Sequence, residues 1–365
     1  MNLSPALEKA YTEEHLSARE AQRAAEFIAF GPIVFQVSRL MLKHGILEHL
    51  RDADDGLTIA EVAAQTGLSK YAAQVLLEAS LSIGTVLVNP ATERFSLSKT
   101  GWFLLNDPAT RVNVDFNHDV NYLGFFDLDA ALESGTPAGL KRLGNWPTIY
   151  EGLSQLSPAA QKSWFAFDHF YSDSSFDEAL QIVFASPRPK RLLDVGGNTG
   201  RWALRCVECD ADVEVCIADL PQQIEMMRAN VAGHAGCERI SGYGVDLLAA
   251  DSALPADRAF DAIWMSQFLD CFSEEQVSAI LAKAAAIMQP QTTLYIMETL
   301  WDRQRFEPAA FCLTQTSLYF TAMANGNSKM FHSDDLLRLI NASGLSVRCI
   351  HDNLGQGHSI IEVCK

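Results

Sequence analysis

The stretch "LLDVGGNTGRWAL", Leu192 to Leu204, decides the fold, because a short apolar run turns through glycines into a helix. The run ends in Asp194, and three glycines follow within a few residues. Glycine-rich turns between a strand and a helix bring backbone N–H groups close to a bound nucleotide. The stretch therefore predicts a strand, a nucleotide-binding turn and a helix within an α/β sheet.

Strand-like and helix-like segments alternate from Arg191 to the C-terminus. The expected strands are "RLLDVGG", "VEVCIADLP", "ISGYGVDLL", "AFDAIWMSQF" and "TLYIMETLW", and "SVRCIHDN" with "HSIIEVC" as a closing pair. The helix "SEEQVSAILAKAAAIMQP" has Ser273 and Gln276 in capping-box positions. This alternation predicts an α/β fold: a Rossmann-like, doubly wound and mostly parallel sheet with helices on both faces. Ligands of such sheets bind outside the C-terminal ends of the strands.

Residues 1–106 have a different pattern. Thr58 and Glu61 form a capping box, Ser69 caps the next helix, and "TVLVNPATERFSLSKTG" predicts two strands around a turn. Helix, helix, helix and hairpin is the order of a winged helix, so we expect a mostly α-helical winged-helix domain here. The helix Lys70–Ile83 offers one lysine against one glutamate, which does not favour DNA binding. We expect its apolar helices to pack against a second copy of the chain.

The remaining residues complete the expected domain organisation. Residues 107–185 are rich in aromatic side chains at helical spacing, and we expect them to link the domains and to form part of a substrate pocket. The catalytic domain is expected over residues 186–365.

Composition excludes several classes of partner. The 365 residues carry a net charge of −17, which disfavours nucleic acid. No apolar stretch reaches the roughly 18 residues of a membrane helix, and the charged N-terminus predicts a cytoplasmic protein. Cys206 and Cys209 form a C-x-x-C, but no matching pair follows at zinc-finger spacing, so we expect buried thiols and no metal.

The glycine-rich turn does not fit the usual phosphate-binding motifs. Asn198 interrupts the G-x-G-x-x-G fingerprint, and no Gly-Lys-Ser/Thr follows. The Asp194 carboxylate would repel a pyrophosphate but attract a cation. Asp219 ends the second expected strand and Asp246 follows the third, placed for a ribose and an adenine amino group. S-adenosylmethionine, a nucleoside with positive charge and no phosphate, fits these three acids.

The motifs "LLDVGGNTG", "ADLP" and "GVDLL" resemble those of class I S-adenosylmethionine-dependent methyltransferases. Nearly the whole chain is similar to the small-molecule O-methyltransferase family, which joins a winged-helix dimerisation domain to a Rossmann-like catalytic domain. The resemblance implies S-adenosylmethionine as cofactor and a homodimer formed through the N-terminal domain. It assigns Asp194 and Gly196 to the methionine moiety, Asp219 to the ribose and Asp246 to the adenine. The other expected cofactor-binding residues are Gly197, Leu220, Leu247 and Gln267.

The family's catalytic histidine has no counterpart here, because Asp270 occupies its position. An unperturbed aspartate titrates at about 4, so it acts as a base only if desolvation raises its pKa. His169 is a second candidate base. Glu298 matches a family acid that supports the missing histidine.

The resemblance implies a small aromatic or phenolic acceptor, of the kind found among polyketides or pigment precursors. O-methylation is the leading interpretation. Methylation of a phenolic ring carbon and a non-catalytic role in binding or regulation remain alternatives. The candidate substrate-contacting residues are His118, Tyr171, Phe268 and His332.

Overall fold

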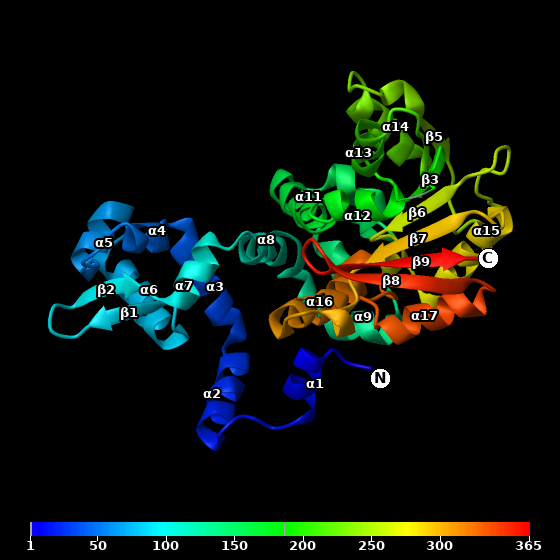
Figure 1. The fold of residues 1–365 in the computed structure, drawn as a ribbon. Coiled ribbons are helices and arrows are strands. Elements are labelled where there is room, and N and C mark those ends of the chain that lie inside the picture. The colour runs from blue at the N-terminus through cyan, green and yellow to red at the C-terminus, as the bar shows by residue number, and fades with distance from the viewer. Residues whose placement is uncertain (1, 186) are drawn as a thin grey trace. The chain divides into compact units, whose positions relative to one another are not determined.

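A computed structural model describes residues 2–185 and 187–365, which form two compact units. The N-terminal unit is Glu14–His118, and the sheet unit is Asp119–Lys365 together with the chain up to Glu13. Figure 1 labels the helices and strands of both units. The predicted domain boundaries at residues 106 and 185 stay a prediction, and Ser186 lies outside the described residues.

The N-terminal unit is mostly helical, with one antiparallel hairpin. Its elements are α2 (Ala18–Ala29), α3 (Gly31–Lys43), α4 (Ile46–Arg51), α5 (Ile59–Thr66), α6 (Lys70–Ile83), β1 (Val86–Asn89), β2 (Arg94–Leu97), α7 (Lys99–Asn106) and α8 (Pro108–Phe116).

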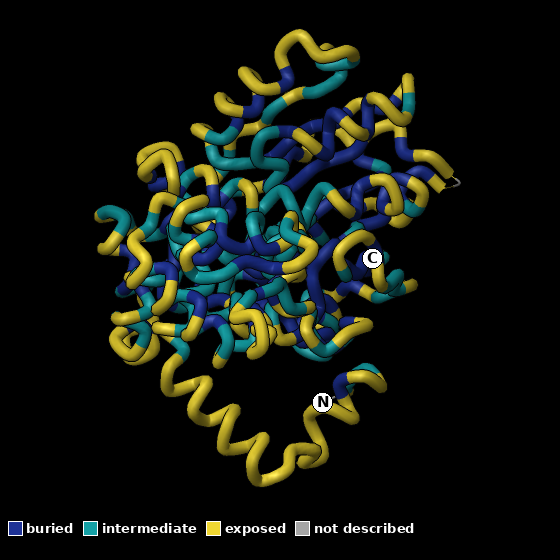
Figure 2. Tube along the Cα trace, turned by 90° about the vertical axis from the view of Figure 1, so that its left-hand side faces the viewer, coloured by how far each residue is buried: buried dark blue, intermediate teal, exposed yellow. Residues whose placement is uncertain are grey.

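The predicted caps of this unit are confirmed. Thr58 and Glu61 form the capping box of α5, and the Ser69 side chain accepts from the backbone of Ala72 at the start of α6. The polar N-terminus holds two helices, α1 (Pro5–Thr12) and α2, and Ser17 begins α2 with a capping box of its own. No residue of α2 is buried, as its exposed colour in Figure 2 shows.

Within the described chain, no single helix is both long and apolar enough to cross a membrane. The consecutive helices Ala18–Ala29 and Gly31–Lys43, bent by 75° at their junction, together pass that test of length and composition.

The sheet unit is built on seven strands in the order β5-β4-β3-β6-β7-β9-β8. The strands β3 to β7 run parallel, and β9 and β8 are added antiparallel at one edge. Their bounds are β3 Arg191–Val195, β4 Glu214–Asp219, β5 Ile240–Gly244, β6 Ala262–Ser266, β7 Thr293–Glu298, β8 Ser346–Leu354 and β9 His358–Cys364. This confirms the predicted α/β sheet with its closing strand pair.

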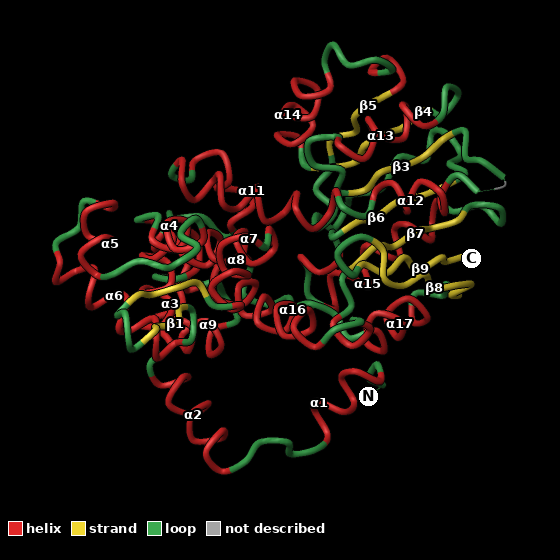
Figure 3. Tube along the Cα trace, turned by 60° about the vertical axis from the view of Figure 1, so that its left-hand side comes forward, coloured by secondary structure: helices red, strands yellow, loops and turns green. Residues whose placement is uncertain are grey.

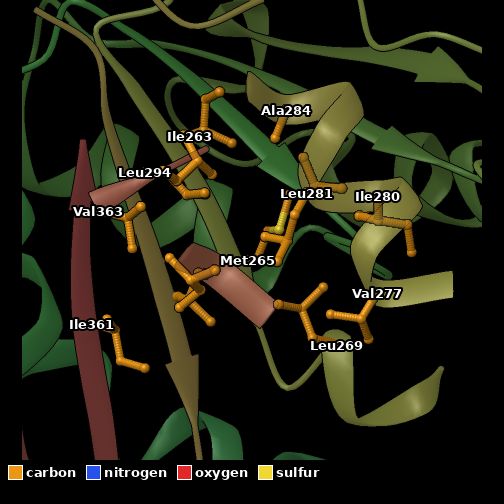
Figure 4. Packing of buried hydrophobic residues seen from close by; sticks show 14 of the residues in the cluster. Ile263, Met265, Leu269, Val277, Ile280, Leu281, Ala284, Leu294, Ile361 and Val363 are labelled. Carbon is orange, nitrogen blue, oxygen red and sulfur yellow. The ribbon is translucent and has the colours of Figure 1, made fainter. Parts of the chain in front are cut away.

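Helices cover both faces of the sheet (Figure 3). One face packs against α15 (Glu274–Ile287) and α17 (Ser333–Ala342), and the other packs against α12 (Phe176–Val183), α13 (Arg201–Cys209) and α14 (Pro221–Val231). Figure 4 shows the first face, where side chains of β6, β7, β9 and α15 interlock. The predicted capping box of α15 is present.

The third parallel strand is shorter than predicted. We expected a strand through "ISGYGVDLL", but β5 ends at Gly244. The carboxylate of Asp246 accepts a hydrogen bond from the backbone of Leu248 at 2.9 Å, which turns the chain away from the sheet. The shortening leaves Asp246 in a loop just beyond the strand.

The remaining helices of the sheet unit lie in the segment before β3 and in the connections between the elements given above. They are η2 (Gly124–Asp127), α9 (Leu128–Ser134), η3 (Ala138–Arg142), α10 (Ile149–Gly152), η4 (Leu153–Gln155), α11 (Pro158–Asp173), η5 (Cys237–Arg239), η6 (Leu269–Cys271), η7 (Trp301–Arg303), α16 (Glu307–Tyr319) and η8 (Phe320–Ala324), while η1 (Asn117–Asn121) spans the boundary between the units.

Candidate functional site

The glycine-rich turn joins the end of β3 to the start of α13. Gly196 and Gly200 have φ values of 76° and 82°, and Asn198 has a φ of 47°. Asparagine is among the side chains that tolerate this left-handed region. Asn198 therefore keeps a positive φ at a position where the family has glycine.

Two neighbouring side chains lie directly against this turn. A Cβ atom added to Gly196 would lie 2.2 Å from the Phe268 ring, and one added to Gly197 would lie 2.5 Å from Asp194 Oδ2. Both distances are far below a van der Waals contact, so only glycine fits. The turn is thus lined by a carboxyl on one side and an aromatic ring on the other.

Asp194 is a buried acid beside the turn. Asp194 is 2 % exposed, and its Oδ2 atom has no hydrogen-bond partner among the described residues. Burial, and to a lesser extent the charge of nearby Asp219, raise the pKa of its carboxyl to about 8. A buried acceptor without a partner is costly, unless a ligand supplies the missing donor or positive charge.

Asp219 is held in place by the backbone of both adjoining turns. Its Oδ2 accepts from the backbone N–H of Asn198 at 2.8 Å, and its Oδ1 accepts from that of Leu220 at 2.7 Å. Burial raises the pKa of Asp219, and these two hydrogen bonds oppose the rise. Each oxygen keeps a further acceptor site, which a pair of ribose hydroxyls can use.

The other expected cofactor-binding residues lie at the same edge of the sheet. Asp246 is exposed beyond β5, whereas Leu247 is 7 % exposed and packs in the core. Gln267 follows β6 with a φ of 45°, and its buried Oε1 has no partner among the described residues.

This edge fits a cationic adenosyl group. In the parallel register, Asp194 lies beside Ile217 of β4, and Asp219 lies beside Gly244 of β5, so the acids follow adjacent strands. In the described part of the chain, no lysine or arginine forms an ion pair with either acid. The unpartnered buried oxygens of Asp194, Asn198 and Gln267 are all acceptors. The donor set of S-adenosylmethionine, with ammonium, hydroxyl and amino groups, matches them.

A second pair of acids lies beside the first group. Asp270 is 3 % exposed and Glu298 is 1 % exposed. Glu298 Oε1 accepts from the backbone of Phe268 at 3.2 Å and of Leu269 at 2.9 Å, which orients it toward the loop after β6. Its Oε2 has no partner among the described residues. Phe268 thus connects the glycine-rich turn to this acidic pair.

Burial raises the pKa of both acids. It raises the pKa of Asp270 to about 6, and the Cys271 thiol, which donates to Oδ1 at 3.5 Å, opposes the rise. Burial, and then the charge of Asp270, raise the pKa of Glu298 well above its ordinary value.

Helix α11 adds an acid that sequence reasoning missed. Asp168 lies one turn beyond Trp164 on the same face of the helix, and Trp164 Nε1 donates to the hydroxyl of Tyr319 at 2.7 Å. The Asp168 side chain is 32 % exposed, yet surrounding protein raises the pKa of its carboxyl to about 7, and the charge of Asp270 adds to the rise. The sequence singled out its neighbour His169 because an isolated imidazole titrates near neutrality, whereas only the fold gives Asp168 that property.

His169 points toward a positive charge. Its Nδ1 lies 3.2 Å from Nη1 of Arg201, which only donates, so Nδ1 is the acceptor and the proton of the neutral ring is on Nε2. Burial, and then Arg201, lower the pKa of His169. Arg201 also forms an ion pair with Asp173.

The expected substrate-contacting residues come from different elements of the chain. Phe268 lies against the turn, and Tyr171 lies on α11 with its ring 5.0 Å from that of Phe167. His118 belongs to the N-terminal unit. His332 begins α17, where its Nδ1 accepts from the backbone of Asp334 at 3.0 Å and its Nε2 donates to the carbonyl of Asn2 at 3.0 Å.

The two cysteines of the C-x-x-C motif lie in different surroundings. Both lie on α13, where Cys206 is buried and Cys209 is exposed. Across the described ranges, no group of three or more histidine, cysteine or acidic side chains is arranged to hold a metal ion.

Comparison with protein families assigns both parts of the chain. Residues 22–95 match the model of a Dimerisation2-like domain, and residues 167–350 match that of a methyltransferase domain. The second match contains the glycine-rich turn and both acidic groups, and it spans half of the chain.

Individual relatives agree with this assignment. Demethylspheroidene O-methyltransferase of Cereibacter sphaeroides is 25 % identical over 333 residues, covering 91 % of this chain and 83 % of the relative. Bacteriochlorophyllide d C-20 methyltransferase of Chlorobaculum tepidum is 21 % identical and covers 77 % and 79 %. The fold is also that of an O-methyltransferase from neocarzinostatin biosynthesis, solved with S-adenosylmethionine and 2-hydroxy-5-methyl naphthoic acid. That match has a TM-score of 0.60 at 19 % identity and covers 92 % of this chain and 95 % of the other.

The fold, the match over residues 167–350 and the relatives lead to one assignment. The chain belongs to the methyltransferase-domain family, and it is a methyltransferase that uses S-adenosylmethionine as its cofactor.

Proposed function

We propose that this methyltransferase methylates a phenolic hydroxyl of a small aromatic acceptor, and that Asp270 accepts the hydroxyl proton. The observation that carries the proposal is the buried Asp270 beside Glu298, next to the ring that closes the glycine-rich turn. Of the relatives named above, one is by name a demethylspheroidene O-methyltransferase and the other a bacteriochlorophyllide d C-20 methyltransferase, which supports methyl transfer to a small-molecule acceptor.

Each acid has a separate role in this mechanism. When bound, the cofactor supplies the electrophilic methyl group. Asp194, Asp219 and Asp246 would hold its ammonium, ribose and adenine groups through the acceptor atoms described above. Asp270 would take the proton of the acceptor hydroxyl, so that the hydroxyl oxygen can receive the methyl group as the bond from that methyl to the sulfonium sulfur breaks. With a pKa of about 6, Asp270 is ionised at neutral pH. This pKa is closer to the pKa of the acceptor hydroxyl than the pKa of an ordinary aspartate is, which favours proton transfer.

His169 is less suited to be the base. Its Nδ1 already accepts from Arg201, and its Nε2 carries the proton. Burial, and then the charge of Arg201, lower the pKa of His169, because both disfavour the cation that a second proton would create. We therefore give His169 a part in positioning α11 against Arg201.

Methylation of a ring carbon is the second candidate. The relative from Chlorobaculum tepidum is a C-20 methyltransferase by name, so related chains include carbon methylation. Removal of a phenolic proton by Asp270 would also make the ortho ring carbon more nucleophilic. The same acid would then serve either reaction.

Incubation with a panel of phenols and S-adenosylmethionine tests the proposal. We expect one or more acceptors to gain the mass of one methylene group, measured by mass spectrometry, because a hydrogen is replaced by a methyl. Loss of the free phenol in the product indicates O-methylation, and its retention indicates C-methylation. A control without cofactor should leave every mass unchanged. If no phenol gains mass while other nucleophile classes do, the proposed acceptor is wrong.

We further propose that the N-terminal unit pairs two copies of the chain. It matches a Dimerisation2-like domain and carries exposed apolar side chains, among them Ile28 at 79 %, Tyr71 at 78 % and Phe30 at 56 %. Burial of such side chains stabilises a homodimer by roughly 25 cal/mol per Å² of apolar surface.

We expect the wild-type chain to sediment as a dimer at micromolar concentration. The double variant Ile28→Asp with Phe30→Asp should shift the protein to the monomer, because it places charge in the apolar face. Glu26→Gln, on the same exposed helix, is the matched control and should remain dimeric. A monomeric wild type would contradict the proposal.

The cytoplasmic location stays a prediction from the sequence.

A further inference from the structure

The backbone carbonyl of Cys271, directly after Asp270, is bound by a side chain from a distant part of the chain. Asn325 Nδ2 donates a hydrogen bond to this carbonyl at 2.6 Å, across a sequence separation of 54 residues. Cys271 is the last residue of η6, a 3-10 turn of three residues. So short a turn has few hydrogen bonds of its own to fix its position. The hydrogen bond from Asn325 therefore fixes the end of the segment that carries Asp270.

The turn that follows Asn325 sets the orientation of its amide. The Oδ1 atom accepts from the backbone N–H of Asn327 at 3.0 Å and from that of Ser328 at 3.1 Å, and Nδ2 also donates to Ser328 Oγ at 2.8 Å. A flipped amide would place its NH₂ group against two backbone donors. The network of hydrogen bonds thus assigns Nδ2, and not Oδ1, to the Cys271 carbonyl.

The backbone around Asn325 is held in place as well. The N–H groups of Asn325 and Gly326 both donate to the carbonyl of Phe320, at 3.1 and 2.9 Å, at the end of η8. Gly326 has a φ of 90°, and a Cβ atom added there would lie 2.5 Å from Cα of Thr136. A side chain does not fit in that space, so this close approach requires glycine. Asn325 therefore reaches Cys271 from a closely packed turn.

A cavity borders the same junction. It has a volume of about 240 Å³, and its lining includes Phe272, which follows Cys271, and Ser328, which binds the Asn325 amide. Atoms beside a cavity lack packing partners on that side. The hydrogen bond between Asn325 and Cys271 therefore joins the two segments at a place where the packing between them is incomplete.

Cys271 also contacts Asp270 through its side chain. The thiol donates to Asp270 Oδ1 at 3.5 Å, and Asp270 is 3 % exposed. A displacement of Cys271 would therefore move both the peptide unit that follows Asp270 and a donor to its carboxylate. A general base must lie within hydrogen-bond reach of the proton that it takes. A misplacement of about 1 Å in such a group can cost about 100-fold in rate.

We propose, on the basis of the proposed function above, that Asn325 is a positioning residue for Asp270. It acts through the Cys271 carbonyl, and its hydrogen bond keeps η6 where the Asp270 carboxylate reaches the acceptor hydroxyl. Asn325 itself takes up no proton in the reaction. Sequence patterns did not single out this side chain, because a contact over 54 residues leaves no local signal.

Two variants remove the hydrogen bond in different ways. Asn325→Asp keeps the shape and the acceptor oxygen that the turn needs, but it has no donor for the Cys271 carbonyl. Asn325→Ala removes the donor without adding charge. We expect each to lower kcat at least about 10-fold for the phenol of the panel that wild type methylates fastest, because the base is misplaced. The Kd for S-adenosylhomocysteine, measured by calorimetry, should stay within about 3-fold of wild type.

Asn327→Asp is the matched control, because it makes the same chemical change two residues further along the chain. The Asn327 side chain is exposed, and the contribution of this residue to the turn is its backbone N–H. We expect kcat to stay within about 2-fold of wild type. A loss of activity confined to the variants with an added charge, with Asn325→Ala as active as wild type, would overturn the inference.

An Asp270→Asn background separates positioning of the base from a general loss of structure. If Asn325 acts through Asp270, its replacement costs nothing more once the base is absent. The double variant with Asn325→Ala should therefore have a kcat within about 2-fold of Asp270→Asn alone.

The double variant also separates this inference from the proposed function. The same fold-loss from Asn325→Ala in both backgrounds would overturn the inference and leave Asp270 as the base. A wild-type kcat in Asp270→Asn, or a panel in which no phenol is methylated, would instead remove the proposed function and the inference with it.

Discussion

Replacement of Asp270 by asparagine is expected to lower kcat about 100-fold or more, the usual contribution of a positioned general base. The amide has the same shape but cannot take up a proton. The Kd for S-adenosylmethionine should stay within about 3-fold of wild type, because Asp194, Asp219 and the glycine-rich turn are unchanged. Single-turnover rates and calorimetry measure the two quantities separately.

The pH profile of the same pair of proteins tests the role of Asp270 independently. The carboxylate must be ionised to accept a proton, and its pKa is raised to about 6 by burial. The rate of wild type should therefore rise tenfold per pH unit below about pH 6 and level off above it. The residual activity of Asp270→Asn should lack that step.

A matched set of variants identifies the base. Asp270→His restores a base with an ordinary pKa of about 6.5 and should recover part of the lost activity. His169→Gln removes the other candidate and should cost about 10-fold or less through misplacement of Arg201 and α11. If His169→Gln abolishes the pH step while Asp270→Asn retains it, the base is His169.

Replacement of Asp194 by asparagine is expected to weaken cofactor binding and to stabilise the free protein. The loss of affinity for S-adenosylmethionine should be about 100-fold near pH 8, because a buried carboxylate facing a cation is worth several kcal/mol. The free protein should gain on the order of 5 °C in Tm at that pH, because the variant no longer buries an unpaired charge.

The gain in Tm of Asp194→Asn should depend on pH, and its pH dependence follows from the direction in which the pKa of Asp194 is shifted. The pKa of Asp194 is raised in the folded protein to about 8, from an ordinary value near 4. Its contribution to folding stability is fully present below about pH 4 and is lost as the pH rises toward 8. The difference in Tm between variant and wild type should therefore vanish near pH 4, and grow up to pH 8. The cofactor affinity of wild type should increase over the upper part of this range.

Asp219→Ala provides the contrasting variant. It should also lose cofactor affinity, but it removes the acceptor of two backbone N–H groups, those of Asn198 and Leu220, so Tm should fall. Glu225→Gln on the exposed side of α14 should change neither quantity. An Asp194→Asn protein that binds the cofactor as well as wild type would remove Asp194 from the cofactor site.

Much of the fold follows from local patterns. The capping boxes at Thr58 and Ser273 and the strand-turn-helix around Asp194 were predictable because they depend on neighbours within a few residues. The early end of β5 was missed, because the hydrogen bond of Asp246 to the next residues competes with pairing to β4. The alternating pattern alone does not settle that competition.

The sequence by itself determined the alternating sheet, the glycine-rich turn and the order of acids along consecutive strand ends, because periodicity and turn chemistry are local properties. Only the tertiary structure decided the surroundings of the candidate bases. Packing buries Asp270 and Glu298, raises the pKa of both, and turns His169 to Arg201. Burial and neighbouring charges set those pKa values, and both depend on residues that lie far apart in the chain.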